Sequence, residues 1–135
     1  MSGERDLAVL LSSMSPSLDP RHYVFCCVDN AEQVAVLVKQ QRLKGLYYEN
    51  EGTTLILEQA IADEYELQYS GTFSCITLNV HSSLDAVGLT AAVSSALALE
   101  DISANVVAAF FHDHIFINVE DAQKALTTLR NLSQQ

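Results

Sequence analysis

The stretch that decides the fold is residues 73–119, FSCITLNVHSSLDAVGLTAAVSSALALEDISANVVAAFFHDHIFINV. It begins with a strand over 73–80, in which apolar residues mostly alternate with Ser, Thr and Asn. A tight turn then leads into a helix rich in Ala and Ser that ends near Leu99. Two further apolar runs, Ser103–Phe111 and Ile115–Val119, predict a hairpin. This order is typical of a small ligand-binding module rather than of an enzyme.

The helix within this stretch has a predicted cap and a narrow apolar stripe. Ser83 or Asp85 can accept hydrogen bonds from the unpaired backbone N–H groups of its first turn. Its inward positions are Leu89, Val93, Ala96 and Leu97. After the hairpin, a last helix is predicted over 120–132. Its inward positions are Ala122, Ala125, Leu126 and Leu129.

The first half contains the same kinds of element. They are a strand at 22–28, a helix at 31–43 capped by Asn30, a hairpin at 46–58 and a brief helix at 59–65. The helix at 31–43 has Val34, Leu37 and Val38 on one side, which predicts that this side faces inward. The Val-rich segment 34–38 can also be read as a strand. The repeated strand–helix–strand–strand–helix order indicates two diverged halves, and we expect units at 1–70 and 71–135 that do not fold independently.

The segments before and between these elements are read from their local chemistry. Residues 4–13 predict a short helix with leucines on one side. Pro16 and Pro20 predict a loop over 14–21. Gly45 suits the position just after the end of a helix, where a left-handed conformation is common.

Composition excludes several classes of protein. The chain has 135 residues, 49% of them hydrophobic, which is enough for a core in one compact domain or two small ones. A net charge of −10 argues against nucleic acid as a partner. No apolar stretch approaches the roughly 20 residues of a membrane span, and no signal peptide is evident. We therefore expect a cytoplasmic protein that has no membrane partner.

Cysteine and histidine chemistry offers only weak candidates for a site. Cys26, Cys27 and Cys75 have no metal-ligand spacing and are interpreted as buried, reduced thiols; Cys26 and Cys27 point to opposite faces if they lie on a strand. His112 and His114 share a face of the hairpin and can start a metal site, but a third ligand is needed. Support of the turn by Asp113 is the simpler reading. No cofactor and no catalytic residue is predicted.

Several motifs in the second half resemble the ACT domain, a small regulatory module attached to many enzymes of amino-acid metabolism. They are the turn Ser83–Leu89, the helix end Ala96-Leu97-Ala98, the strand entry Ile102–Val107 and the hairpin Phe111–Ile117. With the hairpin at Glu51–Leu55, the chain resembles uncharacterised bacterial proteins built from two ACT-like units in tandem. The resemblance implies an α+β fold of ferredoxin-like βαββαβ units that share an antiparallel sheet.

One departure from that pattern affects the fold. Too few residues follow the last helix to form a fourth strand in the second unit. We therefore expect the two halves to exchange strands, with His22–Val28 as the donor. A structure in which residues 22–28 pair only with residues 45–58 would exclude this donor.

The resemblance also implies a site at the second strand–helix turn, because ACT domains bind amino acids there when they pair. Gly88 lets a ligand approach the backbone, and N–H groups of Val87–Leu89 favour a carboxylate. Asp85 can pair with an ammonium group, and Asn105 can add a hydrogen bond from the next strand. Asp85 and Gly88 can equally be a helix cap and a packing position.

We therefore predict a regulatory module, not an enzyme, that binds an amino acid or similar small metabolite. It would act in trans or by changing its own assembly, and a homodimer is expected. The alternatives are a ligand-free dimerisation or interaction protein, and a small metal-binding protein that uses His112 and His114.

Overall fold

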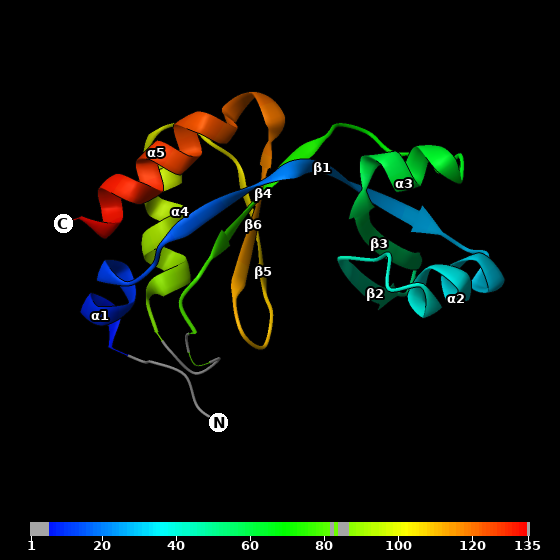
Figure 1. Cartoon of the computed structure of the whole chain (residues 1–135), viewed down its shortest axis with the longest axis horizontal. Helices are drawn as coiled ribbons and strands as arrows, with labels where there is room; N and C mark the ends of the chain where they lie inside the picture. The colour runs from blue at the N-terminus through cyan, green and yellow to red at the C-terminus, as the bar shows by residue number, and fades with distance from the viewer. Residues whose placement is uncertain (1–5, 82, 84–86, 135) are drawn as a thin grey trace. The chain divides into compact units, whose positions relative to one another are not determined.

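A computed structural model of the chain describes residues 6–81, 83 and 87–134 (Figure 1). The elements up to residue 72 are α1 (Leu7–Ser12), β1 (Pro16–Val28), α2 (Ala31–Lys39), β2 (Gly45–Glu49), β3 (Gly52–Glu58) and α3 (Gln59–Glu64). Those that follow are β4 (Phe73–Leu78), α4 (Leu89–Leu99), β5 (Ala104–Ala108), β6 (Asp113–Asn118), the 3-10 turn η1 (Val119–Asp121) and α5 (Ala122–Ser133). The predicted order, including its repetition, is confirmed.

The described residues form two compact units. We call Arg21–Phe73 the continuous unit. The discontinuous unit combines the described residues up to Pro20 with those from Ser74 onward. The expected division at residue 70 therefore differs from this partition in the first segment, because α1 and the start of β1 are grouped with the second half.

The strand order is β2-β3-β1-β4-β6-β5. In the first half β3 lies between β1 and β2, and in the second half β6 lies between β4 and β5. The repeat therefore includes the order of strands in the sheet. Residues 23–28 of β1 pair antiparallel with residues 53–58 of β3, and β5 pairs antiparallel with β6. The predicted α+β class, with ferredoxin-like units and an antiparallel sheet, is confirmed.

The exchanged strand is present, but the predicted donor was wrong. His22–Val28 belongs to the continuous unit and pairs with β3. The discontinuous unit instead receives Pro16–Pro20, the segment predicted as a loop. Asn79, just after β4, binds the start of this segment: its backbone N–H donates to the Met14 carbonyl and its Nδ2 to the Ser15 carbonyl, both over 2.9 Å. Proline is compatible with a strand at its first residue or where no N–H is required, so two prolines do not exclude a strand here.

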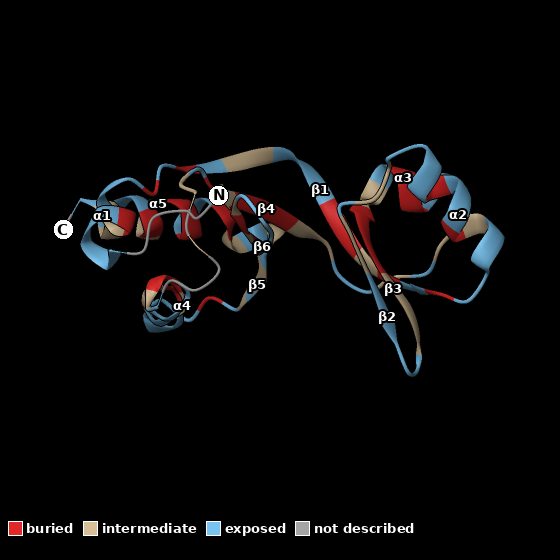
Figure 2. Cartoon of the chain, turned by 90° about the horizontal axis from the view of Figure 1, so that it is seen from below, coloured by how far each residue is buried: buried red, intermediate tan, exposed pale blue. Residues whose placement is uncertain are grey.

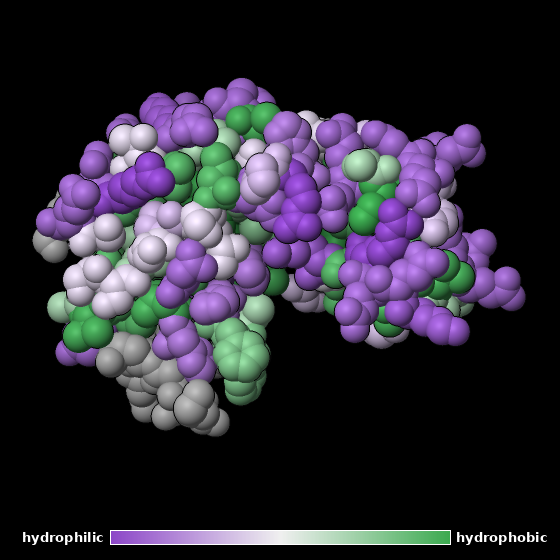
Figure 3. Space-filling view, viewed as in Figure 1, coloured by the Kyte–Doolittle hydropathy of each residue, from purple (hydrophilic) through white to green (hydrophobic). Residues whose placement is uncertain are grey.

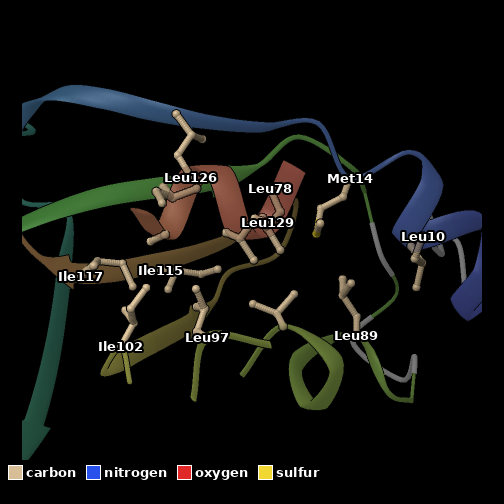
Figure 4. Close-up of a cluster of buried hydrophobic side chains, with 13 residues drawn as sticks. Leu10, Met14, Leu78, Leu89, Leu97, Ile102, Ile115, Ile117, Leu126 and Leu129 are labelled. Atoms are coloured by element: carbon tan, nitrogen blue, oxygen red, sulfur yellow. The ribbon is translucent and has the colours of Figure 1, made fainter. Parts of the chain in front are cut away.

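The core of the discontinuous unit lies between its helices and strands (Figure 4). α1 contributes Leu10, α4 contributes Leu89, Val93 and Leu97, and α5 contributes the four inward residues expected from its pattern. Ile115 and Ile117 of β6 are fully buried in the same cluster. The apolar stripes of α4 and α5 are therefore confirmed, apart from Ala96, which is only partly buried.

The continuous unit has a smaller core of its own. Figure 2 shows buried residues on β1, β3, α2 and α3. Val24, Leu37, Leu55, Leu57 and Ala62 are fully buried there. On the face shown in Figure 3, hydrophilic residues cover most of the surface, as the acidic composition indicates.

Three local expectations for the continuous unit were wrong. α2 ends at Lys39 rather than near residue 43, because Gln41 adopts a left-handed backbone with φ 55°. Gly45 is accordingly the first residue of β2 and not a helix terminus. Cys26 is buried as expected, but Cys27 is exposed, since neighbouring strand residues point to opposite faces.

No helix within residues 6–81, 83 and 87–134 has the length and apolar character required to cross a membrane.

Candidate functional site

The turn before α4 contains the predicted site residues that the structure describes. Gly88 is the N-cap of α4 and has φ 104°, a conformation that favours glycine. The N-cap glycine has no side chain to cap the helix, and the Gly88 carbonyl accepts the backbone N–H of Ala92 over 2.8 Å. Of the two residues predicted as caps, Ser83 lies five positions before this N-cap, and Asp85 lies outside the described residues.

The three described residues of this turn have different environments. Val87 is 82% exposed, whereas Leu89 is buried in the core and can offer a ligand only its backbone. The side chain of Leu7 in α1 lies against Gly88: a Cβ built on Gly88 would be 3.2 Å from Leu7 Cδ2. The space that glycine leaves at this turn is thus occupied by an apolar side chain of the same unit.

Asn105 lies on β5, opposite Phe116 of β6. Its side-chain Nδ2 donates a hydrogen bond to the Phe116 carbonyl over 3.1 Å. Within the described residues, no hydrogen bond joins Asn105 to the turn at 87–89. The amide therefore supports the β5–β6 hairpin. Gly88 contacts Leu7 and Asn105 bonds to Phe116.

The equivalent turn of the first half, between β1 and α2, borders a pocket of about 400 Å³ in the continuous unit. The pocket is lined by Val28, Asp29, Ala31, Val34, Ala35, Val38, Lys39, Tyr48 and Thr53. Asn30 caps α2 by accepting the backbone N–H of Gln33 over 3.0 Å. Asp29, directly before the cap, is one of the residues that line this largely apolar pocket.

The chemistry of this pocket suits a small molecule with both polar and apolar parts. Asp29 offers an anionic group, Lys39 a cationic one, and Thr53 a hydroxyl group. Val28, Val34 and Val38 supply the apolar wall. Asp29 precedes α2 and Lys39 is its last residue, so the two charged residues flank opposite ends of the helix.

This pocket was not predicted, although the sequence contains a signal for it. Asn30 was predicted only as a helix cap, and Val38 was predicted to face inward. Val38 is in fact 51% exposed and lines the pocket. Because the two halves share one order of elements, a ligand site at the turn 85–89 predicts an equivalent site at the first strand–helix turn, beside Asp29.

The His-Asp-His tip is engaged in local hydrogen bonds. His114 Nδ1 lies 2.9 Å from the Thr77 hydroxyl, and His112 Nδ1 lies 3.5 Å from the Val80 carbonyl. Asp113 is buried, and burial raises the pKa of its carboxyl although nearby His112 lowers it. In the described part of the chain, no three His, Cys, Asp or Glu side chains are grouped to hold a metal ion.

Comparison with known proteins identifies the family. One model of the ACT domain matches residues 2–74, and a second matches residues 71–131. The chain belongs to the ACT domain family. The predicted resemblance is thereby confirmed for two ACT domains in tandem, a type of module that typically binds ligands and regulates other proteins.

Solved structures support the same fold for this ACT protein. A protein of unknown function from Vibrio cholerae, described as a possible transport protein, is 46% identical, with a TM-score of 0.81 over 94% of this chain and 95% of its own. An Agrobacterium tumefaciens protein is 17% identical, with a TM-score of 0.71 over 87% of each chain. The regulatory subunit of Thermus thermophilus aspartate kinase is 11% identical, with a TM-score of 0.68 over 89% of this chain and 97% of its own. None of the curated proteins matches the chain.

Proposed function

We propose that this ACT protein is a non-catalytic sensor that binds an amino acid in the pocket beside the β1–α2 turn. The observation that supports the proposal most strongly is that Asp29 lines a largely apolar pocket of about 400 Å³. Pockets of about 300–1,000 Å³ that are mainly apolar, with a few polar groups, are typical small-molecule sites.

The groups around the pocket fit the parts of an amino acid. Asp29 pairs with the ammonium group, because an opposite charge at hydrogen-bond distance is the strongest partner that a cation finds. N–H groups in the first turn of α2, together with the Thr53 hydroxyl, bind the carboxylate. The wall formed by Val28, Val34 and Val38 takes the side chain.

The turn at 85–89 is proposed as the second site of the tandem. Asp85 would pair with the ammonium group, the N–H groups of Val87–Leu89 would bind the carboxylate, and Asn105 would contribute from β5. The Leu7 side chain lies against Gly88. A ligand at this turn must therefore displace the Leu7 side chain, and we expect weaker binding there than beside Asp29.

Regulation would follow from a difference in affinity between two states. A ligand stabilises whichever state binds it better, so an amino acid bound near an interface shifts assembly or partner binding in trans. We propose a cytoplasmic homodimer as the functional form. In one chain the edge strands of the sheet are β2 and β5, and an edge strand can pair with a second copy of the chain.

The test is a calorimetric titration of the full chain with the amino acid that most raises its melting temperature. Asp29→Asn removes the carboxylate that pairs with the ammonium group and is expected to weaken binding about 10-fold to 100-fold, from the loss of one charged hydrogen bond of about 1.5–3 kcal/mol. Asp101→Asn is the matched control, because it makes the same substitution at an exposed aspartate of the other unit. The left-handed backbone of Asp101, with φ 59°, also suits asparagine. Equal affinities of the two variants would refute the Asp29 site.

A specific observation favours a second candidate function, that of a homodimerisation module. Phe110 and Phe111, which are 57% and 58% exposed, contact each other edge to face beside His81, with their ring centroids 4.9 Å apart. Light scattering of the full chain measures the oligomeric state. If a dimer dissociates in Phe110→Ser/Phe111→Ser and no amino acid binds, dimerisation alone is the function.

A further inference from the structure

Cationic side chains gather around a second pocket of the continuous unit, at the opposite end of α2 from Asp29. The pocket has a volume of about 180 Å³. It is lined by Arg21, Tyr23, Gln41, Arg42, Leu43, Lys44 and Glu58. Three of the seven basic residues of the chain therefore line one small pocket, on a protein whose net charge is −10.

The loop that carries two of these cations is fixed by its backbone. The Arg42 N–H donates to the Leu37 carbonyl over 3.0 Å, and the Lys44 N–H donates to the Ile56 carbonyl over 2.7 Å. Gln41, with its left-handed backbone, turns the chain out of α2 between these bonds. The loop is thus held at both ends, and little conformational entropy is lost when it binds a ligand.

The Arg42 side chain is also held in place. Its Nη1 and Nη2 donate to the Glu64 carboxylate over 3.1 and 2.9 Å, and its guanidinium lies 5.7 Å from the centre of the Tyr65 ring. A guanidinium has five N–H donors, so the pair with Glu64 leaves further donors for a ligand. Glu64 therefore orients Arg42 without using all of its donors.

Lys44 is the cation whose charge is least compensated. Its ammonium lies 5.7 Å from the centre of the Tyr23 ring, and no carboxylate within the described residues forms an ion pair with it. Glu58 pairs with Arg21 at 3.6 Å, a long separation for an ion pair. Arg21 and Arg42 are each paired with a carboxylate, those of Glu58 and Glu64. The excess positive charge of the pocket therefore comes from Lys44.

We propose that this pocket binds a phosphate group, either free or carried by a small metabolite. A phosphate dianion needs more than one cation, and its acceptor oxygens match the fork of arginine and the point charge of lysine. The small volume admits the phosphate and little more, so the rest of a metabolite would lie outside the pocket. This site is separate from the Asp29 pocket, and neither proposal depends on the other.

The test is a titration of the isotopically labelled full chain with sodium phosphate, followed by ¹H–¹⁵N correlation spectra. Sodium chloride at equal ionic strength is the reference. We expect saturable shifts of the amides of residues 41–44 with phosphate and none with chloride. A parallel titration with glycerol 2-phosphate separates the two sources: tighter binding of the ester indicates a metabolite, and tighter binding of inorganic phosphate indicates the free ion.

Variants then assign the charges. Lys44→Gln changes an exposed side chain and is expected to weaken phosphate binding 10-fold or more, and Arg21→Gln/Lys44→Gln to abolish saturation. Arg130→Gln, an exposed cation near the end of α5, is the matched control and should change affinity less than twofold. The proposal is overturned if neither ligand gives a saturable shift in the unmodified chain, or if Arg130→Gln weakens binding as much as Lys44→Gln.

Discussion

Leu7 of α1 lies against Gly88, the N-cap of α4, so closely that a Cβ on Gly88 would be 3.2 Å from Leu7 Cδ2. The two residues are 81 positions apart in the sequence, yet both belong to the discontinuous unit. The contact shows that the N-terminal helix is part of the second ACT half, and it sets the requirement for glycine at this turn.

Gly88→Ala is expected to destabilise the protein by about 1–3 kcal/mol, because alanine is strained at φ 104° and its methyl group would press on Leu7. Denaturant unfolding measures the effect. Gly71→Ala is the matched control: it also has a positive φ, 75°, but its nearest neighbour would be 4.0 Å from the new methyl group. If the two substitutions cost the same, the Leu7 contact contributes nothing to the requirement for glycine.

Leu10→Ala is expected to cost about 2–5 kcal/mol, since Leu10 is fully buried in the core of the discontinuous unit. Val9→Ala, one residue away and 44% exposed, should cost less than about 1 kcal/mol. Urea unfolding followed by circular dichroism measures both. A small loss with Leu10→Ala would mean that α1 is dispensable, against the expectation that the second half cannot fold without the N-terminal segment.

Much of the fold was predictable because it follows from local patterns. Both hairpins, the stripe of α5 and the repeated order of elements are recorded in the spacing of apolar residues and turn formers. The N-terminal strand was not predictable from Pro16 and Pro20, because prolines stop helices but are tolerated where a strand needs no N–H donor. Its place beside β4 is set by long-range pairing, which no local pattern contains.

The candidate sites were predictable only in part, for a similar reason. Gly88 and Asn105 were predicted as ligand-binding positions, but the residues that they contact in the structure, Leu7 and Phe116, come from other elements. The pocket beside Asp29 depends on the exposure of Val38, which the helical pattern alone predicted to be buried. The cationic pocket combines residues from β1, β3 and the loop after α2, and only the folded chain brings them together.

The Arg42–Glu64 pair gives a pH dependence with a definite sign. The hydrogen bonds from Arg42 lower the pKa of Glu64 in the folded protein. The stabilisation is therefore present above the unfolded pKa of about 4.3 and is lost as pH falls through the lower folded value. Glu64→Gln should reduce the melting temperature at pH 7, and the difference should shrink progressively as the pH falls below about 4. Glu51→Gln, an exposed turn residue, is the control and should show no such trend. A constant difference across this range would contradict the account.

Asp113 is expected to give the opposite sign. Burial raises the pKa of its carboxyl, so the folded state favours the protonated form. The contribution of Asp113 to the stability of the folded protein is complete below its unfolded pKa of about 3.9. It is lost as the pH rises through the higher pKa of the folded state. Asp113→Asn should therefore raise the melting temperature at pH 7 and leave it unchanged near pH 3. A lower melting temperature at pH 7 would show that the ionised carboxylate supports the hairpin tip.

The central claim, that this ACT protein binds an amino acid beside Asp29, is tested most directly by ¹H–¹⁵N spectra of the full chain titrated with each of the twenty amino acids. The account predicts that at least one gives saturable shifts at residues 28–39 and Thr53, and that at 100 times its Kd it adds about 2.7 kcal/mol of stability. Spectra of the folded chain that change with none of the twenty would contradict it.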